Sequence, residues 1–123
     1  MPPASREQIR ARRAYTALEE HPEELADWAE SLPTMLQTNG LLATWAHLLS
    51  KREASMVLQT LADHLWHWEN RHGAQPTPRA VFVGWVSDDQ AQLTGTRLRR
   101  LTDEALAFAV WLKRAGKASE GGE

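Results

Sequence analysis

Residues 98–114 read LRRLTDEALAFAVWLKR, and this stretch decides the class of the fold. Its apolar residues recur at intervals of three and four positions, which places them on one face of an α-helix. They are Leu98, Leu101, Ala105, Phe108 and Leu112. Upstream, Ser87 and Gln90 have the spacing of a capping box, and downstream Gly116 is a typical helix end. The sequence therefore predicts a long C-terminal helix between these signals, buried along one face.

Further helices are predicted upstream, because capping residues, prolines and glycines divide the chain into apolar segments of helical period. Ser5 suits the N-cap of a first helix, and Pro22 ends that helix because the residue before a proline disfavours α-helical geometry. Pro33 is expected to stop or kink the second helix. Asn39 and Gly40 mark a turn or a helix end before the next apolar segment.

Residues 53–71 carry the clearest apolar face after these segments, and a loop follows them. Thr77 and Pro78 can open the next helix as its N-cap and its first helical residue. Residues 81–86 are ambiguous, because their β-branched side chains also suit a buried strand. We predict a helix there, since a single strand would have no partner elsewhere in the chain.

The composition is that of one soluble globular domain. The chain has 123 residues and no cysteine, so it suits a single core without disulfides or thiolate ligands. Its N-terminus lacks the apolar run of a secretory signal, and no segment approaches the roughly 20 apolar residues that span a bilayer. We expect an all-α fold, a single compact bundle of about five to six helices over residues 1–123. Residues 1–4 and 117–123 are expected to be flexible, and the protein to be cytoplasmic and without cofactors.

The charges are unevenly distributed along the chain. The formal net charge of −2 gives no general attraction to nucleic acid, and residues 19–30 hold six acidic side chains and no basic one. Arg6, Arg10 and Arg13 fall on one face of the first predicted helix, and a second basic group lies within residues 97–100. Guanidinium groups suit phosphate oxygens. On the residues alone, a solvated face with salt bridges is the simpler explanation.

Two stretches of the sequence resemble a known family. Residues 32–51 contain Leu-Pro-x-Met-Leu, then Asn-Gly-Leu-Leu-Ala-Thr, and end on Leu-Leu-Ser-Lys. Residues 101–114 contain Leu-Thr-Asp-Glu-Ala-Leu and end on Trp-Leu-Lys-Arg. In this order they resemble the small α-helical subunit of the type III-B CRISPR effector, the Cmr complex. The residues that carry the resemblance are Pro33, Asn39, Gly40, Leu41, Thr102, Glu104, Trp111 and Leu112.

The resemblance implies a non-catalytic subunit of an RNA-guided, RNA-targeting complex that acts in antiviral defence. Its partners would be the backbone and head subunits, another copy of itself, the guide RNA and the target RNA. Its basic residues would line the target-RNA groove and contact phosphates rather than bases. The residues expected to do so are Arg6, Arg10, Arg12, Arg13, Lys51, Arg97, Arg100, Lys113 and Arg114.

The six tryptophans and five histidines invite other interpretations. Four tryptophans lie among apolar residues at helical spacing, so we expect them to be buried. These four are Trp28, Trp45, Trp68 and Trp111. Trp66 lies off this pattern, which favours partial exposure and a contact with a partner subunit. His47 is expected to make a buried hydrogen bond, and His64 with His67 lacks the third ligand that a zinc site requires.

Three alternative functions stay open. The chain could be a helical adaptor whose acidic and basic faces bind only proteins, or the equivalent small subunit of a type III-A complex. A small metal-dependent hydrolase built around His64 and His67 is the weakest alternative. The sequence has no nucleophile motif and no phosphate-binding glycine loop, so we expect no enzyme.

Overall fold

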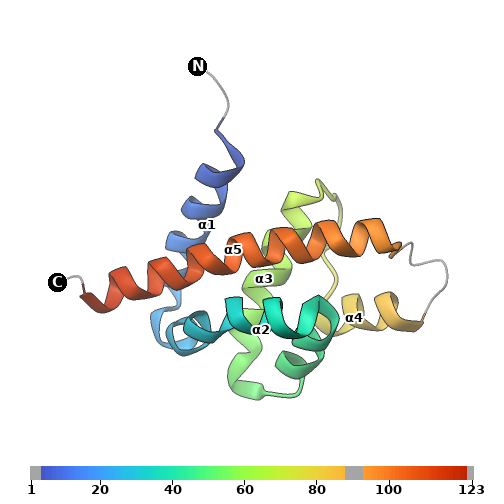
Figure 1. Cartoon of the computed structure of the whole chain (residues 1–123), viewed down its shortest axis with the longest axis horizontal. Coiled ribbons are helices and arrows are strands. Elements are labelled where there is room, and N and C mark those ends of the chain that lie inside the picture. Colours follow the sequence, from blue (N-terminus) through green and yellow to red (C-terminus); the bar gives the residue numbers. More distant parts are fainter. Residues whose placement is uncertain (1–3, 88–92, 122–123) are drawn as a thin grey trace.

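The computed structural model describes residues 4–87 and 93–121, and every element in these residues is helical (Figure 1). The five α-helices in this part of the chain are α1 (Arg6–Glu20), α2 (Pro22–Leu49), α3 (Ser55–Trp68), α4 (Pro78–Ser87) and α5 (Gly95–Gly121). A short 3-10 turn, Arg52–Ala54, connects α2 to α3. The prediction of an all-α fold with a long C-terminal helix is confirmed.

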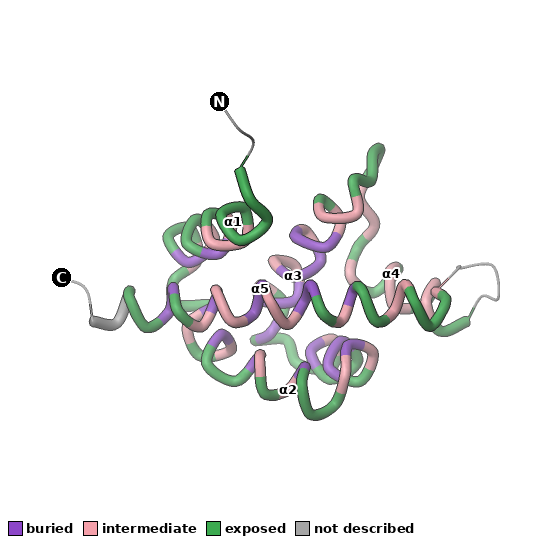
Figure 2. Tube along the Cα trace, turned by 45° about the horizontal axis from the view of Figure 1, so that its top comes forward, coloured by how far each residue is buried: buried purple, intermediate pink, exposed green. Residues whose placement is uncertain are grey.

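Helix α5 crosses the molecule, and α1, α2 and α3 all pack against it (Figure 1). Its buried positions recur along the helix in Figure 2. Leu101, Ala105, Phe108 and Leu112 are at most 1% exposed, whereas Leu98 is only partly buried. The apolar face predicted from the sequence is therefore the core face at every position but the first.

The start of α1 is fixed by a capping box. The Ser5 hydroxyl accepts a hydrogen bond from the backbone N–H of Gln8 at 3.1 Å, and the Ser5 N–H donates to the Gln8 side chain at 2.7 Å. Pro22 then begins α2. Both predicted boundaries are confirmed. Ala14 and Leu18 are the buried residues of α1, so this helix meets the core along one narrow face.

Helix α2 bends sharply at Gly40. The Gly40 backbone has φ +86° and ψ 173°, so two helical arms of α2 meet there. A positive φ of this size is readily adopted only by glycine. Pro33 lies within the first arm, and the helix continues past it. Across the bend, the Thr44 hydroxyl donates to the carbonyl of Met35 at 3.1 Å, which ties the second arm to the first.

Helix α4 begins as the sequence predicts. The Thr77 hydroxyl accepts a hydrogen bond from the backbone N–H of Ala80 at 3.2 Å, and Pro78 is the first helical residue. Residues 81–86 are helical, which confirms that prediction. No residue of α4 is fully buried, so this helix covers the edge of the core rather than its centre.

The start of α5 differs from the prediction. Ser87 is the last residue of α4, where its hydroxyl donates to the carbonyl of Val83, and Gln90 lies outside the described residues. Thr94 caps α5 instead, because its hydroxyl accepts from the backbone N–H of Arg97 at 3.1 Å. The prediction that Ser87 opens the last helix is therefore wrong, because Ser87 ends α4 and α5 begins only at Gly95, after the Thr94 cap.

The end of α5 lies further along the chain than predicted, since the helix continues to Gly121. Gly116 is buried, and a methyl group there would lie 3.7 Å from the Cβ of Ala29 in α2. Gly116 is therefore a position where two helices pack closely, not a helix end. The segments expected to be flexible, 1–4 and 117–123, fall partly outside the described residues.

Candidate nucleic-acid interface

The carboxylate of Glu104 is the polar centre of the core. Glu104 lies on α5 and is 2% exposed. Its Oε1 accepts a hydrogen bond from Nη2 of Arg10 at 2.6 Å, and its Oε2 accepts from Nε of Arg10 at 2.8 Å. Nε2 of His64 lies 2.8 Å from the same Oε2. One carboxylate thus joins α1, α3 and α5, and we call these three residues the Glu104 centre.

The partners in the Glu104 centre determine its protonation. Burial raises the pKa of Glu104, but the hydrogen bonds from Arg10 and His64 outweigh burial and lower the pKa to about 2. Burial is the main cause that lowers the pKa of His64, against the raising effect of Glu104. His64 is therefore neutral at pH 7 and donates through Nε2. Its buried Nδ1 is then an acceptor, without a hydrogen-bond partner in the described part of the chain.

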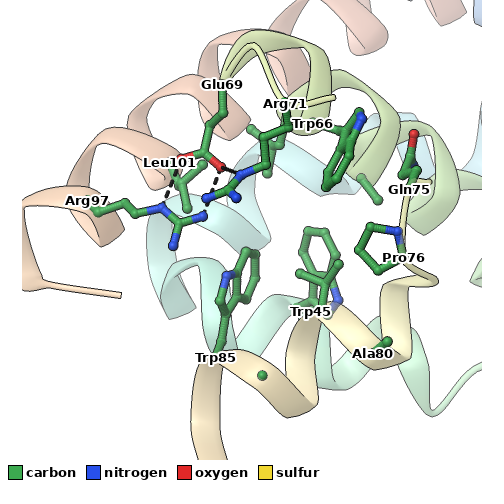
Figure 3. A pocket seen from close by; sticks show the side chains of 14 residues that line it. Trp45, Trp66, Glu69, Arg71, Gln75, Pro76, Ala80, Trp85, Arg97 and Leu101 are labelled. Carbon is green, nitrogen blue, oxygen red and sulfur yellow. Dashed lines mark hydrogen bonds and ion pairs between the residues drawn. The ribbon is translucent and has the colours of Figure 1, made fainter. Parts of the chain in front are cut away.

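A second carboxylate, Glu69, holds two arginines just after the end of α3 (Figure 3). Nε and Nη2 of Arg97 each donate to Glu69 at 2.9 Å, and Nε of Arg71 donates to Glu69 at 3.1 Å. Burial raises the pKa of Glu69, but the two arginines lower it further, so it lies below its ordinary value. The bidentate pair joins the first turn of α5 to the end of α3.

These interactions divide the cations that the sequence proposed as RNA contacts. Arg10 and Arg97 have internal carboxylate partners, so the fold already neutralises their charges. Lys113 lies 4.0 Å from a carboxylate of α2. Arg114 lies over the Trp111 ring, 4.7 Å from its centroid. RNA contact stays a prediction for all four, but each already has a partner within the protein.

A cleft with unpaired arginines lies next to the Glu104 centre. It is lined by Arg6, Arg10, Trp68, Arg100, Asp103 and Glu104, and its volume is about 380 Å³. Arg6 and Arg100 are exposed, and neither side chain has a hydrogen-bond or ion-pair partner among the described residues. Trp68 was expected to be buried, but it is the last residue of α3 and is only partly buried. We call this site the Trp68 cleft.

A second basic cleft lies at the other end of α3. Lys51, Arg52 and Arg79 line it, no acidic side chain does, and its volume is about 270 Å³. All three side chains are exposed and have no partner in the part of the chain that is described. The sequence pointed to Lys51 alone, although its neighbour Arg52 carried the same signal. Arg79 comes from α4, so only the fold brings it here. We call this site the Lys51 cleft.

Arg12 and Arg13 line a third groove, of about 480 Å³. Glu20 and Asp63 line it as well, so two carboxylates share the groove with the two arginines. This balance of charge makes the groove a weaker site for phosphate than either cleft. RNA contact by Arg12 and Arg13 stays a prediction.

Comparison with known proteins assigns the chain to a family. A family model described as CRISPR-associated protein (Cas_Cmr5) matches residues 6–119. The chain belongs to this family. It is also similar to the crystal structure of a CRISPR-associated Cmr5 family protein from Thermus thermophilus. The identity is 26%, the match covers 94% of this chain and 97% of that one, and the TM-score is 0.71. A search of curated proteins found no match.

The Cmr5-family assignment confirms the resemblance, and the protein is a small CRISPR-associated Cmr-type subunit. Several residues that carried the resemblance hold the fold. Gly40 makes the bend in α2, and Leu41 and Leu112 are buried. The Thr102 hydroxyl donates to the carbonyl of Leu98 at 2.7 Å within α5.

This Cmr5-family chain also has an aromatic pocket of about 250 Å³, shown in Figure 3, to which Trp45, Trp66 and Trp85 contribute. Nε1 of Trp45 donates to the carbonyl of Pro78 at 2.9 Å, and the Trp45 ring meets Trp85 edge to face, with centroids 4.9 Å apart. Trp66 is partly buried, as expected from its position off the apolar face. Its contact with a partner subunit stays a prediction.

Of the other residues expected to be buried, Trp45 is 1% exposed, whereas Trp28 and Trp111 are only partly buried. His47 is exposed and lies edge to face with Trp28, with ring centroids 6.3 Å apart. The predicted buried hydrogen bond of His47 is therefore wrong. The second arm of α2 turns Leu41 and Trp45 toward the core, which leaves position 47 on the opposite side.

His64 and His67 do not share a site. His64 belongs to the Glu104 centre, while His67 is exposed and its Nδ1 lies 2.8 Å from the carbonyl of Asp63. Within residues 4–87 and 93–121, no three His, Asp or Glu side chains gather as metal ligands would. In the same residues no helix has the length and apolar character needed to cross a membrane.

Proposed function

We propose that this Cmr-type subunit lines the RNA groove of a type III-B CRISPR effector with the cations of the Trp68 and Lys51 clefts. The observation that carries the proposal is that these clefts gather five exposed basic side chains that have no partner among the described residues. The five are Arg6, Lys51, Arg52, Arg79 and Arg100. Cations that the fold leaves unpaired are the ones available to a ligand.

The proposed mechanism is electrostatic. Guanidinium and ammonium groups that replace counterions on the RNA backbone contribute affinity for any sequence. Phosphate contacts of this kind position a strand without reading its bases. That suits a complex in which pairing between guide and target supplies the sequence specificity, as it does in RNA-guided effectors generally.

We propose no catalytic role for the subunit. His64 and Glu104 lie close enough for acid–base chemistry, but both are 2% exposed. Arg10 already occupies both oxygens of the carboxylate. Because a substrate has no access to this pair, the arrangement supports a structural role.

The proposed partners are those that the family implies. They are the backbone and head subunits of the complex, another copy of this chain, the guide RNA and the target RNA, in the cytoplasm. Trp66, at the edge of the aromatic pocket, is the residue we propose for a contact with a neighbouring subunit. The genes next to this one distinguish a type III-B complex from the related type III-A complex.

The test uses the complex reassembled from the backbone and head subunits, guide RNA and this subunit. One variant carries glutamine at the five cations of the two clefts. We expect it to assemble, to bind target RNA more weakly, and to lose about one unit of log–log salt slope for each phosphate contact removed. Target affinity is measured at several salt concentrations.

A control variant removes the same number of charges from outside the two clefts, at Arg12, Arg99, Lys113, Arg114 and Lys117. It has the same net charge as the first variant, so any difference between them reports position rather than total charge. If the cleft variant keeps the parental affinity and salt slope, the two clefts are not RNA contacts, and the adaptor function is favoured instead. Arg12, Lys113 and Arg114 are themselves predicted RNA contacts, so the proposal allows the control variant a smaller loss. If the control variant loses as much as the cleft variant, the unpaired cations of the clefts have no special role, and the proposal is wrong.

A further inference from the structure

Trp68 differs from the tryptophans whose rings are already covered. Trp28 and Trp45 each pack against another aromatic ring, and Trp111 lies under a guanidinium group. Trp68 is only partly buried, and no ring or cation covers its indole among the described residues. Trp68 is also one of the residues that line the Trp68 cleft. Part of a large aromatic surface is therefore open to whatever enters the cleft.

The two unpaired arginines of the cleft and Trp68 come from three different helices. Arg6 is the first residue of α1, Trp68 is the last residue of α3, and Arg100 lies near the start of α5. All three line one cleft of about 380 Å³, which is within the range of about 300–1,000 Å³ typical of small-molecule sites. The cleft thus combines an aromatic platform with two unpaired cations, which is the combination that binds single-stranded nucleic acid.

The rest of the cleft is already ordered and nearly neutral. Arg10 and Glu104 line it as a bidentate pair, so they offer a fixed wall rather than a net charge. Asp103 is the remaining acidic residue of the lining. Two unpaired arginines against one carboxylate leave the cleft with a positive balance, which favours an anionic ligand.

We propose that the Trp68 cleft binds one unpaired nucleotide of single-stranded RNA, with its base stacked on Trp68 and its phosphates at Arg6 and Arg100. The nucleotide must be unpaired, because a base inside a duplex has no free face to stack on a side chain. The inference rests on the proposed function, since it needs RNA to reach this subunit. It adds a contact with an RNA base to a surface that is otherwise proposed to contact only RNA phosphates.

The first experiment changes Trp68 in the reassembled complex and measures target-RNA affinity across salt concentrations. Trp68→Leu removes the aromatic face, and we expect binding to weaken by about tenfold with an unchanged salt slope. Trp68→Phe keeps a smaller aromatic face, so it should recover most of the loss. The Phe variant also separates stacking from folding, because it repacks the same apolar position.

The second experiment separates two neighbouring arginines of α5. Arg100 lines the cleft, whereas Arg99 is also exposed and does not. Arg100→Gln should flatten the salt slope by about one unit, while Arg99→Gln should leave it unchanged. Both variants remove one charge from the same helix, so equal effects would overturn the placement of a phosphate in this cleft.

A third experiment identifies directly which RNA base lies next to Trp68. Target RNA carrying 5-iodouridine at successive positions is irradiated in the complex, and the cross-linked peptide is identified by mass spectrometry. We expect a cross-link to Trp68 from a limited set of positions. A cross-link pattern that never includes Trp68, together with parental affinity of Trp68→Leu, overturns the inference.

The outcomes distinguish this inference from the function on which it rests. If the five-cation variant loses binding while Trp68→Leu binds as the parent does, the groove function stands and the stacking site is wrong. If the five-cation variant binds normally, both are wrong. If Trp68→Leu fails to join the complex while Trp68→Phe joins, the cleft holds a side chain of a partner protein, and the RNA subsite is overturned.

Discussion

Arg6 and Arg10 are about one turn apart on α1, yet the fold gives the same side chain two opposite environments. Arg10 binds Glu104, 94 positions away in the sequence. Arg6 has no side-chain partner among the described residues. Helix α5 repeats the contrast, because Arg97 binds Glu69 while Arg100, three residues later, is exposed and unpaired among the residues described.

The contrast shows what decides the role of a cation in this protein. Helical spacing puts these arginines on one face, but a carboxylate supplied by another helix decides which of them is neutralised. Removing a partner from a buried pair leaves an uncompensated charge and is costly, whereas exposed charges contribute little to stability. Stability and RNA binding should therefore depend on different arginines of the same helix.

The largest expected effect is a loss of stability when the buried pair of this comparison, Arg10 with Glu104, is broken. Glu104→Gln keeps the shape of the side chain but leaves the Arg10 charge without its counter-ion in the core. We expect it to lower the free energy of unfolding by about 3–5 kcal/mol. Urea unfolding at pH 7 measures the loss. Replacing both partners, as Arg10→Met with Glu104→Leu, should recover part of it, and a single-variant loss below about 1 kcal/mol contradicts the role of the centre.

The second expectation is a loss of stability in acid. The pKa of Glu104 falls from an ordinary 4.5 to about 2 on folding, so its charged form contributes about 3 kcal/mol above pH 4.5. This contribution is lost as the pH falls from about 4.5 to about 2. The lowered pKa of His64 acts in the same direction, because the unfolded chain takes up its proton first as the pH falls below about 6.5.

The acid dependence is measured as the free energy of unfolding between pH 7 and pH 3. Glu104→Gln should show a much weaker decline over the lower part of this range, because it has no carboxyl to protonate. His64→Asn should flatten only the upper part. Parallel curves for the parent and Glu104→Gln would show that the Glu104 pKa is not lowered by the fold.

The third expectation concerns the pair between α3 and α5. Glu69→Gln leaves Arg97 and Arg71 without their shared carboxylate, but both sites are closer to solvent than the Glu104 centre. We therefore expect a smaller loss, of about 1–2 kcal/mol. Hydrogen exchange should become faster mainly in the first turns of α5. A loss as large as that of Glu104→Gln would mean that exposure does not weaken this pair.

Local signals in the sequence were enough to predict most of the helices. Ser5 and Thr77 satisfy backbone donors within three residues of themselves, and the face that includes Leu101 and Phe108 repeats within one helix. The local pattern fails where two residues could each cap the same helix. Ser87 has capping spacing, but it is the last residue of α4, and α5 begins at Gly95 after the Thr94 cap, so the start of α5 could not be placed from spacing alone.

For the candidate site, the sequence predicted the type of residue, a basic side chain, but not which basic residues the fold leaves unpaired. Arg6, Arg100 and Lys51 are basic residues that the sequence proposed, yet nothing local separates Arg6 from Arg10. That separation depends on Glu104, which the fold brings to α1 from near the end of the chain. Trp68 was expected in the core because its spacing matches the apolar face, and only the end of α3 leaves it in a cleft.

The smallest expected effect is the change in stability when an exposed arginine is removed, and it tests the comparison most closely. Arg6→Gln and Arg100→Gln should each change the free energy of unfolding by less than about 0.5 kcal/mol, the usual range for surface substitutions. Arg10→Gln, one turn away from Arg6, should cost at least about 2 kcal/mol because Glu104 stays buried with less of its charge compensated. Thermal unfolding of the three variants, measured side by side, gives the ranking. If Arg6→Gln destabilises the protein as much as Arg10→Gln does, Arg6 has an internal partner, and the Trp68 cleft has one cation fewer to offer to RNA.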